Sequence, residues 1–231
     1  MNKKVQKKMI PYIVGCVIFL LLLVSYYLYS QSRNNYQYLK VNSKEHLVYT
    51  ETQTENGHYY QYKPYLNIKG NIGTVINDDI TQYISQYNQE DVCITYDYDV
   101  NGNVLSLVIK VEDYGYAESA IVLHFRSYNI HLKRLELLSD EELFSYYELD
   151  SNGVENLLNQ KLLSYHQDLQ AKGDISSSCN YDCFLESRNF DPGLGDTSFY
   201  IQEGKLVAYK PYTFIQTEAS SEIVYGFTLT N

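Results

Sequence analysis

The chain has 231 residues and a formal net charge of −10, with 26 tyrosines and no tryptophan. An acidic chain of this kind repels nucleic acid, so nucleic acid is excluded as an expected partner. Beyond a short N-terminal segment, about 190 residues remain, which is enough for one domain or for two small, closely packed ones. The many tyrosines suit half-buried strands, because the ring packs while the hydroxyl stays in water.

The N-terminal segment predicts a membrane anchor. Four lysines within residues 1–8 precede an uncharged stretch at 9–32. A helix of about 20 apolar residues spans about 30 Å, the thickness of the hydrocarbon layer of a bilayer. Because the lysines lie before this stretch, residues 1–8 are expected to be a cytoplasmic tail. A cleaved signal peptide is the alternative, but the exit Ser25-Tyr26-Tyr27 lacks a small-x-small cleavage site.

Residues 33–44 are polar and aperiodic and predict a short stalk. Residues 45–231 predict a single extracytoplasmic domain. This domain contains 28 acidic and 11 basic residues, a formal charge of −17. A large charge of one sign attracts cations and basic proteins. The alternative explanation is that acidity only keeps a secreted domain soluble.

The domain begins with a predicted hairpin. Alternating apolar and polar residues at 46–54 and 58–68 flank Asn56-Gly57, which is a strong turn signal. Pro64 in the second run indicates an edge strand or a break, because proline cannot donate to a sheet.

A helix is predicted next, at residues 73–88, with Thr74 or Asn71 as its N-cap. Helical spacing places its apolar residues on one stripe. These residues are Val75, Ile76, Ile80, Tyr83, Ile84 and Tyr87.

The middle of the chain predicts an antiparallel meander. Residues 92–100 and 104–111 alternate on either side of the turn Asn101-Gly102. Runs at 117–128 and 131–138 predict two further strands.

Residues 141–147 predict a short helix. A longer helix is predicted to start at Asn152, since Glu155 three residues later resembles a capping box, and to end at Gly173. Residues 174–197 predict a loop.

Residues 198–207 and 215–230 predict closing strands, with a turn at Glu203-Gly204. The order of hairpin, helix, meander, helix and hairpin is typical of an α+β fold. We therefore expect an antiparallel sheet with two main helices packed on it, preceded by one transmembrane helix.

The residues of the chain predict no catalytic, metal or cofactor site. No two histidines have i, i+4 spacing, and none belongs to an H-E-x-x-H pattern. Asp97 and Asp99 share one strand face and predict a solvated surface rather than an acid–base pair. Residues 148–153 resemble the start of a calcium loop, but the twelfth position is Asn159, so a capped helix start is favoured. The histidines are His46, His58, His124, His131 and His166.

Cys179 and Cys183 are candidates for a disulfide, because the domain is expected outside the cell. They lack the second pair of cysteines that a zinc site of this kind needs. Cys93 lies in a predicted strand and is expected to be a buried apolar residue.

The closing segment suggests a family. Residues 199–214, FYIQEGKLVAYKPYTF, contain an aromatic strand, a turn at Gly204 and a Pro211-Tyr212 step. This pattern resembles the C-terminal strand pair of the extracytoplasmic domain of lysozyme-binding anti-sigma-V factors of Gram-positive bacteria. Similar domains precede the catalytic module of membrane-anchored peptidoglycan deacetylases. Phe214-Ile215-Gln216 stands where that family commonly has a glycine.

Segments further upstream agree with the resemblance, which spans roughly residues 46–230. Residues 65–70 with Ile76-Asn77 resemble the start of the first helix of the family. Tyr128-Asn129, residues 135–138 and Leu143-Phe144 resemble the stretch before its second helix.

The resemblance implies a binding domain. Only eight residues precede the predicted anchor, too few for a cytoplasmic sigma-binding domain, and no deacetylase-like module follows. We therefore expect a membrane-anchored, non-catalytic extracytoplasmic domain that binds lysozyme, another basic protein or a cell-wall component. The alternative is a cell-wall-modifying enzyme, or an accessory subunit, related to the peptidoglycan deacetylases.

Tyrosine-rich strands are the expected contact surface, because tyrosine is favoured at binding interfaces. The alternative is that these tyrosines complete the packing of the sheet. The candidate residues are Tyr59, Tyr60, Tyr62, Tyr209, Pro211 and Tyr212.

Overall fold

The structure is a computed structural model of an α+β protein. It describes residues 24, 46–56, 59–87, 92–113, 121–191, 193–216 and 219–230. The predicted tail, anchor and stalk lie outside these residues, Val24 excepted. Among the helices of the described part, none is both long enough and apolar enough to cross a bilayer.

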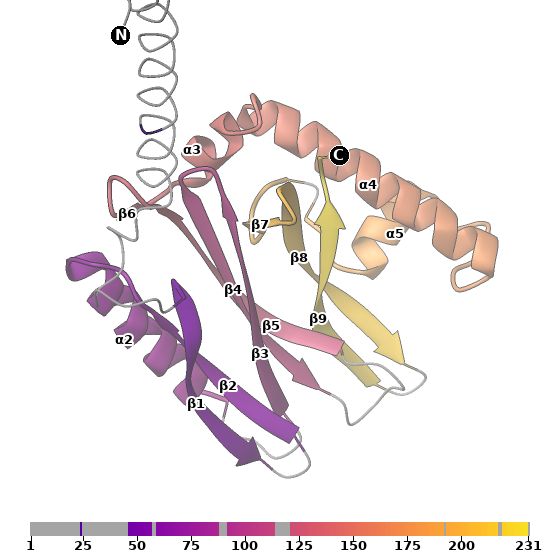
Figure 1. The fold of residues 1–231 in the computed structure, drawn as a ribbon. Helices are drawn as coiled ribbons and strands as arrows, with labels where there is room; N and C mark the ends of the chain where they lie inside the picture. Colours follow the sequence, from indigo (N-terminus) through magenta and orange to yellow (C-terminus); the bar gives the residue numbers. More distant parts are fainter. Residues whose placement is uncertain are drawn as a thin grey trace, which may run out of the picture.

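A six-stranded sheet forms the first half of the domain (Figure 1). Its strands are β1 (Val48–Asn56), β2 (Tyr59–Leu66), β3 (Val92–Asn101), β4 (Val104–Asp113), β5 (Ile121–His131) and β6 (Glu136–Leu137). The strands lie side by side in chain order, and all neighbours are antiparallel except β2 and β3. The predicted first hairpin and the predicted meander are therefore confirmed. Helix α2 (Asn71–Ser85) connects the parallel pair and covers one face of the sheet.

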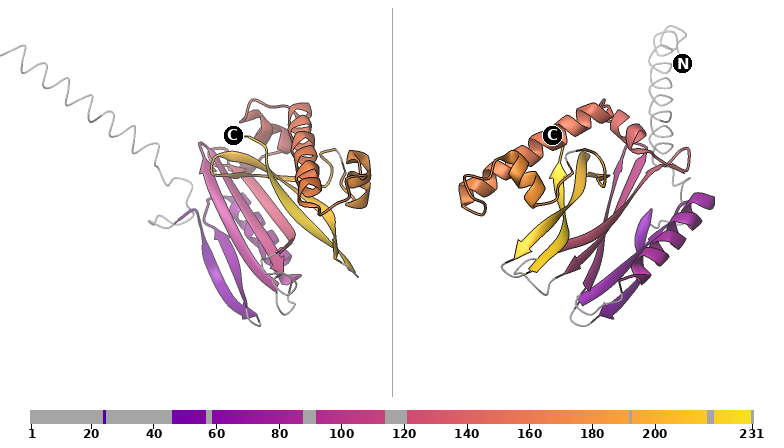
Figure 2. Two further views of the ribbon diagram at one scale, coloured as in Figure 1. Left: turned by 90° about the vertical axis from the view of Figure 1, so that its right-hand side faces the viewer. Right: turned by 180° about the vertical axis from the view of Figure 1, so that it is seen from behind.

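A second, three-stranded antiparallel sheet packs on the opposite face of the first (Figure 2). It consists of β7 (Ser198–Gln202), β8 (Lys205–Gln216) and β9 (Ala219–Thr228). Its outer face is covered by α3 (Asp140–Ser145), α4 (Ser151–Lys172) and α5 (Tyr181–Ser187). The domain thus has four layers, and α2 and α4 lie on different sheets rather than on the single sheet that was predicted.

Strand β4 is the centre of the domain because both of its faces are buried. Leu105, Leu107 and Ile109 point to the α2 side and are fully buried. Val104 and Val108 point to the other side and pack against the three-stranded sheet and its helices. A strand covered on both faces needs apolar residues at successive positions, which explains the nearly unbroken apolar run of β4.

Two buried polar side chains protect the free edge of β7. Asn129 Nδ2 donates to the carbonyl oxygen of Phe199 at 2.8 Å, and the amide of Ile201 donates to Ser106 Oγ at 2.8 Å. The two side chains also bond to each other, at 2.6 Å. An unpaired strand edge is a site of unwanted pairing. Here, side chains from β4 and β5 occupy that edge and fix the two sheets together.

The helix boundaries differ from the predictions at their caps. Helix α2 follows Gly70, whose φ of 85° favours glycine, and neither predicted residue is its N-cap. Helix α4 is capped by Asp150, whose carboxylate accepts the amide of Gly153, instead of by Asn152. The predicted C-terminal end of α4 at Gly173 is confirmed.

The strand boundaries differ where the pattern crosses a turn. Strand β5 continues to His131 without the predicted break, and most of the predicted strand 131–138 is a turn. The closing region forms three strands, because the predicted turn at Glu203-Gly204 separates β7 from β8. Helix α5 lies within the predicted loop 174–197.

Candidate ligand-binding groove

The structure does not bring the predicted contact tyrosines together. Tyr60 on β2 is 44% exposed, Tyr62 is half-buried, and their ring centroids lie 6.2 Å apart. Tyr59 is the first residue of β2, and its side chain lies outside the description. These residues belong to the six-stranded sheet, whereas the other candidates belong to β8 of the three-stranded sheet.

Tyr209 and Tyr212 are interior residues, which corrects their prediction as contact residues. Their exposed fractions are 7% and 6%, and Pro211 between them is half-buried. Strand β8 lies between the six-stranded sheet and the helices, so both of its faces are covered. Tyr209 packs on Phe125 of the six-stranded sheet, with centroids 4.6 Å apart. Tyr212 packs on the helix side, so the packing alternative describes both residues.

Cys179 and Cys183 form a disulfide, with Cα atoms 5.4 Å apart. The bond joins the segment after α4 to the first turn of α5. The carbonyl oxygen of Cys179 lies 2.9 Å from His166 Nε2 and accepts a hydrogen bond from Gln170 Nε2, also at 2.9 Å. These contacts attach the disulfide segment to α4.

The other chemical motifs of the sequence have structural roles. Asp97 pairs with Lys110 at 2.7 Å, and Asp99 accepts the amide of Gly204 at 2.7 Å, so both carboxylates have partners. The predicted capped helix start at 148–153 is confirmed. Within the described ranges, no three His, Cys, Asp or Glu residues cluster closely enough to hold a metal ion. His58 lies outside these ranges. Cys93 is buried and free, as expected.

The candidate site is a groove of about 350 Å³ where four elements meet. Helix α2, strand β5 and strand β7 form three of its sides, and the segment from β6 into α3 forms the fourth. The lining residues are Asp79, Arg126, Ser127, Tyr128, Asn129, Leu137, Leu138, Asp140, Thr197, Ser198 and Phe199.

One wall of the groove is held by a charged network. Arg126 on β5 contacts both carboxylate oxygens of Asp79 on α2 at 2.9 Å. Tyr128 donates its hydroxyl to the same carboxylate at 2.7 Å, and burial, together with this bond, raises the pKa of Tyr128. The guanidinium of Arg126 also lies over the ring of Tyr83, 5.5 Å from its centroid. The network fixes the position of Arg126, which remains half exposed.

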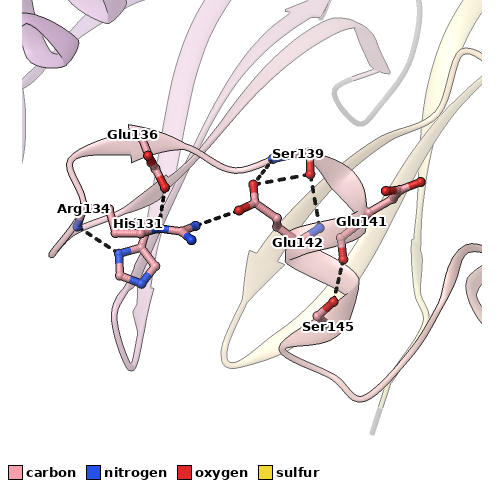
Figure 3. A network of polar contacts seen from close by, with 7 residues as sticks. All are labelled: His131, Arg134, Glu136, Ser139, Glu141, Glu142 and Ser145. Carbon is pink, nitrogen blue, oxygen red and sulfur yellow. Dashed lines mark hydrogen bonds and ion pairs between the residues drawn. The ribbon is translucent and has the colours of Figure 1, made fainter.

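The opposite wall is held by the network in Figure 3. Arg134 pairs with Glu136 and with Glu142, the latter at 2.8 Å. Glu142 accepts the amide of Ser139, and Ser139 Oγ accepts the amide of Glu142, which is a capping box. Hydrogen bonds from Ser139 and Arg134 lower the pKa of Glu142. These contacts fix the segment that carries Leu137, Leu138 and Asp140 into the groove.

Asp140 has a different environment from the other acids of this wall. No described residue forms a hydrogen bond or ion pair with its carboxylate. Asp140 is exposed, but the protein atoms around its carboxylate desolvate it in part and raise its pKa above the ordinary value. Together with Ser127 and Ser198, this carboxylate gives the groove polar groups that are free to bind a ligand.

The groove was not predicted from the sequence, because its residues come from four segments that no local pattern links. A weak signal exists in β5, where Arg126 and Tyr128 are two residues apart and therefore share a face. No signal in the sequence places Asp79 beside them.

The fold and groove define an α+β domain with a polar cleft at the junction of its two sheets. Comparisons with protein-family models, curated proteins and solved structures found no match.

Proposed function

We propose that the chain is a membrane-anchored, non-catalytic extracytoplasmic binding domain. Its proposed ligand is a basic protein such as lysozyme, or a component of the cell wall. The proposal includes the transmembrane helix at residues 9–32 and the cytoplasmic tail at 1–8, which rest on the sequence. The observation that carries the binding role is the groove with its two fixed walls.

The disulfide supports the extracytoplasmic location. Disulfides persist in oxidising compartments and are rare in the cytosol, where thiols are kept reduced. The Cys179–Cys183 bond lies in an ordered segment that His166 and Gln170 hold on α4. An outside location agrees with four lysines preceding the predicted anchor.

The geometry of the groove supports ligand binding. Binding sites usually combine a concave apolar surface with a few fixed polar groups. Leu137 and Leu138 supply the apolar part, while Arg126 and Asp140 supply charges on opposite walls. Because both walls are already held by internal bonds, little side-chain freedom is lost when a ligand binds.

The negative charge of the domain supports the proposal that its ligand is basic. The domain carries a formal charge of −17, and this excess steers a cationic protein towards it. Asp140 supplies an unpaired carboxylate within the groove. Bringing a cation to a partly desolvated carboxylate is more favourable than bringing it to a hydrated one.

Location is tested by adding protease to intact cells that express the full chain with a C-terminal epitope. We expect loss of the epitope, because residues 45–231 lie outside the membrane. An epitope added at the N-terminus should survive on a short fragment. Protection of the C-terminal epitope until the cells are lysed would contradict the proposed location.

Binding is tested with the full chain in detergent, using lysozyme and purified cell wall at several salt concentrations. We expect the association rate with lysozyme to fall steeply as salt rises, because exposed charges are screened beyond about 8–10 Å at physiological ionic strength. Replacing Asp140 with asparagine should weaken binding about 3- to 10-fold, the effect of one lost charged contact.

Asp168 on α4 provides the matched control, since it is also exposed but lies away from the groove. D168N should leave the affinity nearly unchanged, and both variants should melt like the parent chain. The binding proposal fails if neither lysozyme nor cell wall binds at low salt. Release of acetate or of new glycan ends from peptidoglycan by the purified chain would instead favour the enzyme alternative.

A further inference from the structure

Two strands bring an edge to the groove, β5 and the start of β7. Side chains close the edge of β7, because Asn129 donates to the carbonyl oxygen of Phe199 and the amide of Ile201 donates to Ser106. An edge that is closed in this way is protected from pairing with a further strand. The edge that can still accept a strand at the groove is therefore that of β5.

Two hydrogen bonds show which main-chain groups of β5 point outward. The carbonyl oxygen of Asn129 accepts the amide of Leu138, and that of His131 accepts the amide of Leu135, both at 2.8 Å. In an antiparallel strand, the main-chain groups of alternate residues point to the same side. Ser127 precedes Asn129 by two residues, without a bulge between them, so its amide and carbonyl also point away from β4. Because Ser127 lines the groove, these two groups face the ligand.

Strand β6 stops short of Ser127. It pairs with Ile130 and His131, and the next segment begins α3 with Ser139 as its N-cap. Figure 3 shows the capping box that Ser139 forms with Glu142, which ends the pairing with β5. Among the residues that the structure describes, none forms a hydrogen bond with the amide or the carbonyl of Ser127. The position that follows β6 along the edge of β5 is therefore unpaired within the described chain.

The side chains beside this edge suit a basic segment. Among the lining residues, the carboxylates of Asp79 and Asp140 outnumber the guanidinium of Arg126. Arg126 already pairs with Asp79, so the carboxylate of Asp140 is the charge that a ligand meets without a competing partner from the described residues. Leu137 lies on the same wall and is 46% exposed, which offers apolar surface to the aliphatic part of a lysine or arginine side chain.

We propose that a basic partner protein places an extended segment along the edge of β5, antiparallel to this strand and in line with β6. One residue of the segment accepts the amide of Ser127 and donates to its carbonyl oxygen, while a lysine or arginine of the segment binds Asp140. This inference rests on the proposed function, because it states how the proposed ligand occupies the groove. It selects a protein ligand over a glycan, since a glycan lacks the regularly spaced amides and carbonyls of a strand.

The position of β5 in its sheet supports this mode of binding. When an extended segment is added to a sheet, hydrogen bonds of the main chain give affinity, and alternate side chains give specificity. Strand β5 pairs with β4 from Ile121 to His131, so its outer edge is held in strand geometry before a ligand arrives. A preformed edge lowers the entropic cost of binding.

Hydrogen exchange resolved at single residues tests the inference on the full chain in detergent. In the free chain, we expect the amide of Ser127 to exchange fast and the amide of Tyr128, which points to β4, to exchange slowly. Saturating lysozyme should slow the exchange of Ser127 at least about 10-fold. The control is the amide of Thr228, which points away from β8 at the edge of β9 and should stay fast.

Proline variants provide the second measurement. S127P removes the outward amide without removing a hydrogen bond to β4, and proline is tolerated on edge strands at such positions. We expect S127P to weaken lysozyme binding about 10-fold, because the hydrogen bond to this amide is lost and the ring obstructs a paired strand. T228P is the matched control on β9 and should leave the affinity unchanged. Circular dichroism should show the same fold for both variants as for the parent chain.

The third measurement uses the parent chain with two synthetic octapeptides of alternating lysine and threonine. One peptide is N-methylated at every lysine and the other at every threonine, so both have the same charge but each lacks the amides of one edge. We expect one of the two peptides to bind at least about 10-fold more weakly than the other, because only one edge of an extended segment pairs with β5.

The outcomes separate this inference from the proposed function. If lysozyme binds but neither protects Ser127 nor distinguishes S127P from T228P, or if both peptides bind equally, the inference is wrong and the binding function stands. Binding of purified cell wall without binding of lysozyme or of either peptide has the same meaning. If lysozyme, cell wall and peptides all fail to bind at low salt, the proposed function fails together with this inference.

Discussion

Replacing Phe184 with alanine is expected to lower the free energy of unfolding by about 3–5 kcal/mol, the usual cost of removing a buried aromatic ring. Phe184 lies on α5 and is fully buried. Its ring centroid lies 5.1 Å from the ring of His166 and 5.6 Å from that of Phe190. The cavity left by alanine cannot collapse easily, because the disulfide and α4 hold its surroundings in place. Urea unfolding followed by circular dichroism measures the change.

Two further variants complete this test. Phe184→Leu should cost less than Phe184→Ala, because it keeps most of the apolar volume. Leu163→Ala, at an exposed position of α4, should change stability by no more than about 0.5 kcal/mol. A loss below 1 kcal/mol for Phe184→Ala, on the order of a surface change, would contradict the position of α5 in the core.

This prediction concerns a segment that the sequence pattern assigned to a loop. Helix α5 has seven residues, too few to show helical periodicity, and Asn180 and Asp191-Pro192 on either side favour loops. Its stability depends on packing against α4 rather than on propensity, as expected for a short helix. Longer elements with clear periodicity, such as β3, β4 and α4, were predicted to within a few residues.

The division of the strands into two sheets illustrates a second limit of prediction from the sequence. Alternation predicts strands at 198–207 and 215–230, which overlap β7, β8 and β9, but it specifies neither the division into three strands nor their neighbours. The separation of the two sheets depends on side chains that are distant from β7 in the sequence. Asn129 and Ser106 form hydrogen bonds with the edge of β7, where another strand would otherwise pair. The groove depends on the same junction, so it could not be predicted either.

The interior position of Tyr209 and Tyr212 leads to a prediction of cooperative unfolding at high pH. Among the residues that the structure describes, five tyrosines are at most 7% exposed. Burial is the first cause that raises the pKa of each above the ordinary value of 10.0. The five are Tyr83, Tyr128, Tyr200, Tyr209 and Tyr212.

Whether stability rises or falls with pH depends on whether the folded or the unfolded state binds more protons. Below pH 10.0 these phenols are protonated in both states, so they do not change stability with pH. Above this value, the phenols of the unfolded chain ionise while those of the folded chain stay protonated. Each group then lowers the free energy of unfolding by about 1.4 kcal/mol per pH unit. The summed loss from five such groups exceeds the free energy of unfolding of a typical domain, about 5–15 kcal/mol, within a few pH units.

Lys210 acts in the opposite direction but cannot cancel this loss. It is fully buried, and its ammonium donates to Gly193, Gly195 and Thr197. Burial lowers the pKa of Lys210 below the ordinary 10.5, so the unfolded chain binds more protons and stability rises with pH between the two values. Lys210 alone adds stability, and only in a pH range below 10.5, whereas the five buried tyrosines reduce stability above pH 10.0.

We therefore expect two phases when phenolate absorbance and far-ultraviolet circular dichroism are followed together against pH. Tyrosines at the surface should ionise first, without loss of structure, and the buried tyrosines should ionise only as the circular dichroism disappears. Tyr200→Phe should make the second phase less steep and leave the first phase unchanged, because one fewer proton is released on unfolding. If all tyrosines ionise in one phase while the fold persists, Tyr209 and Tyr212 are accessible to solvent, and their assignment to the interior is wrong.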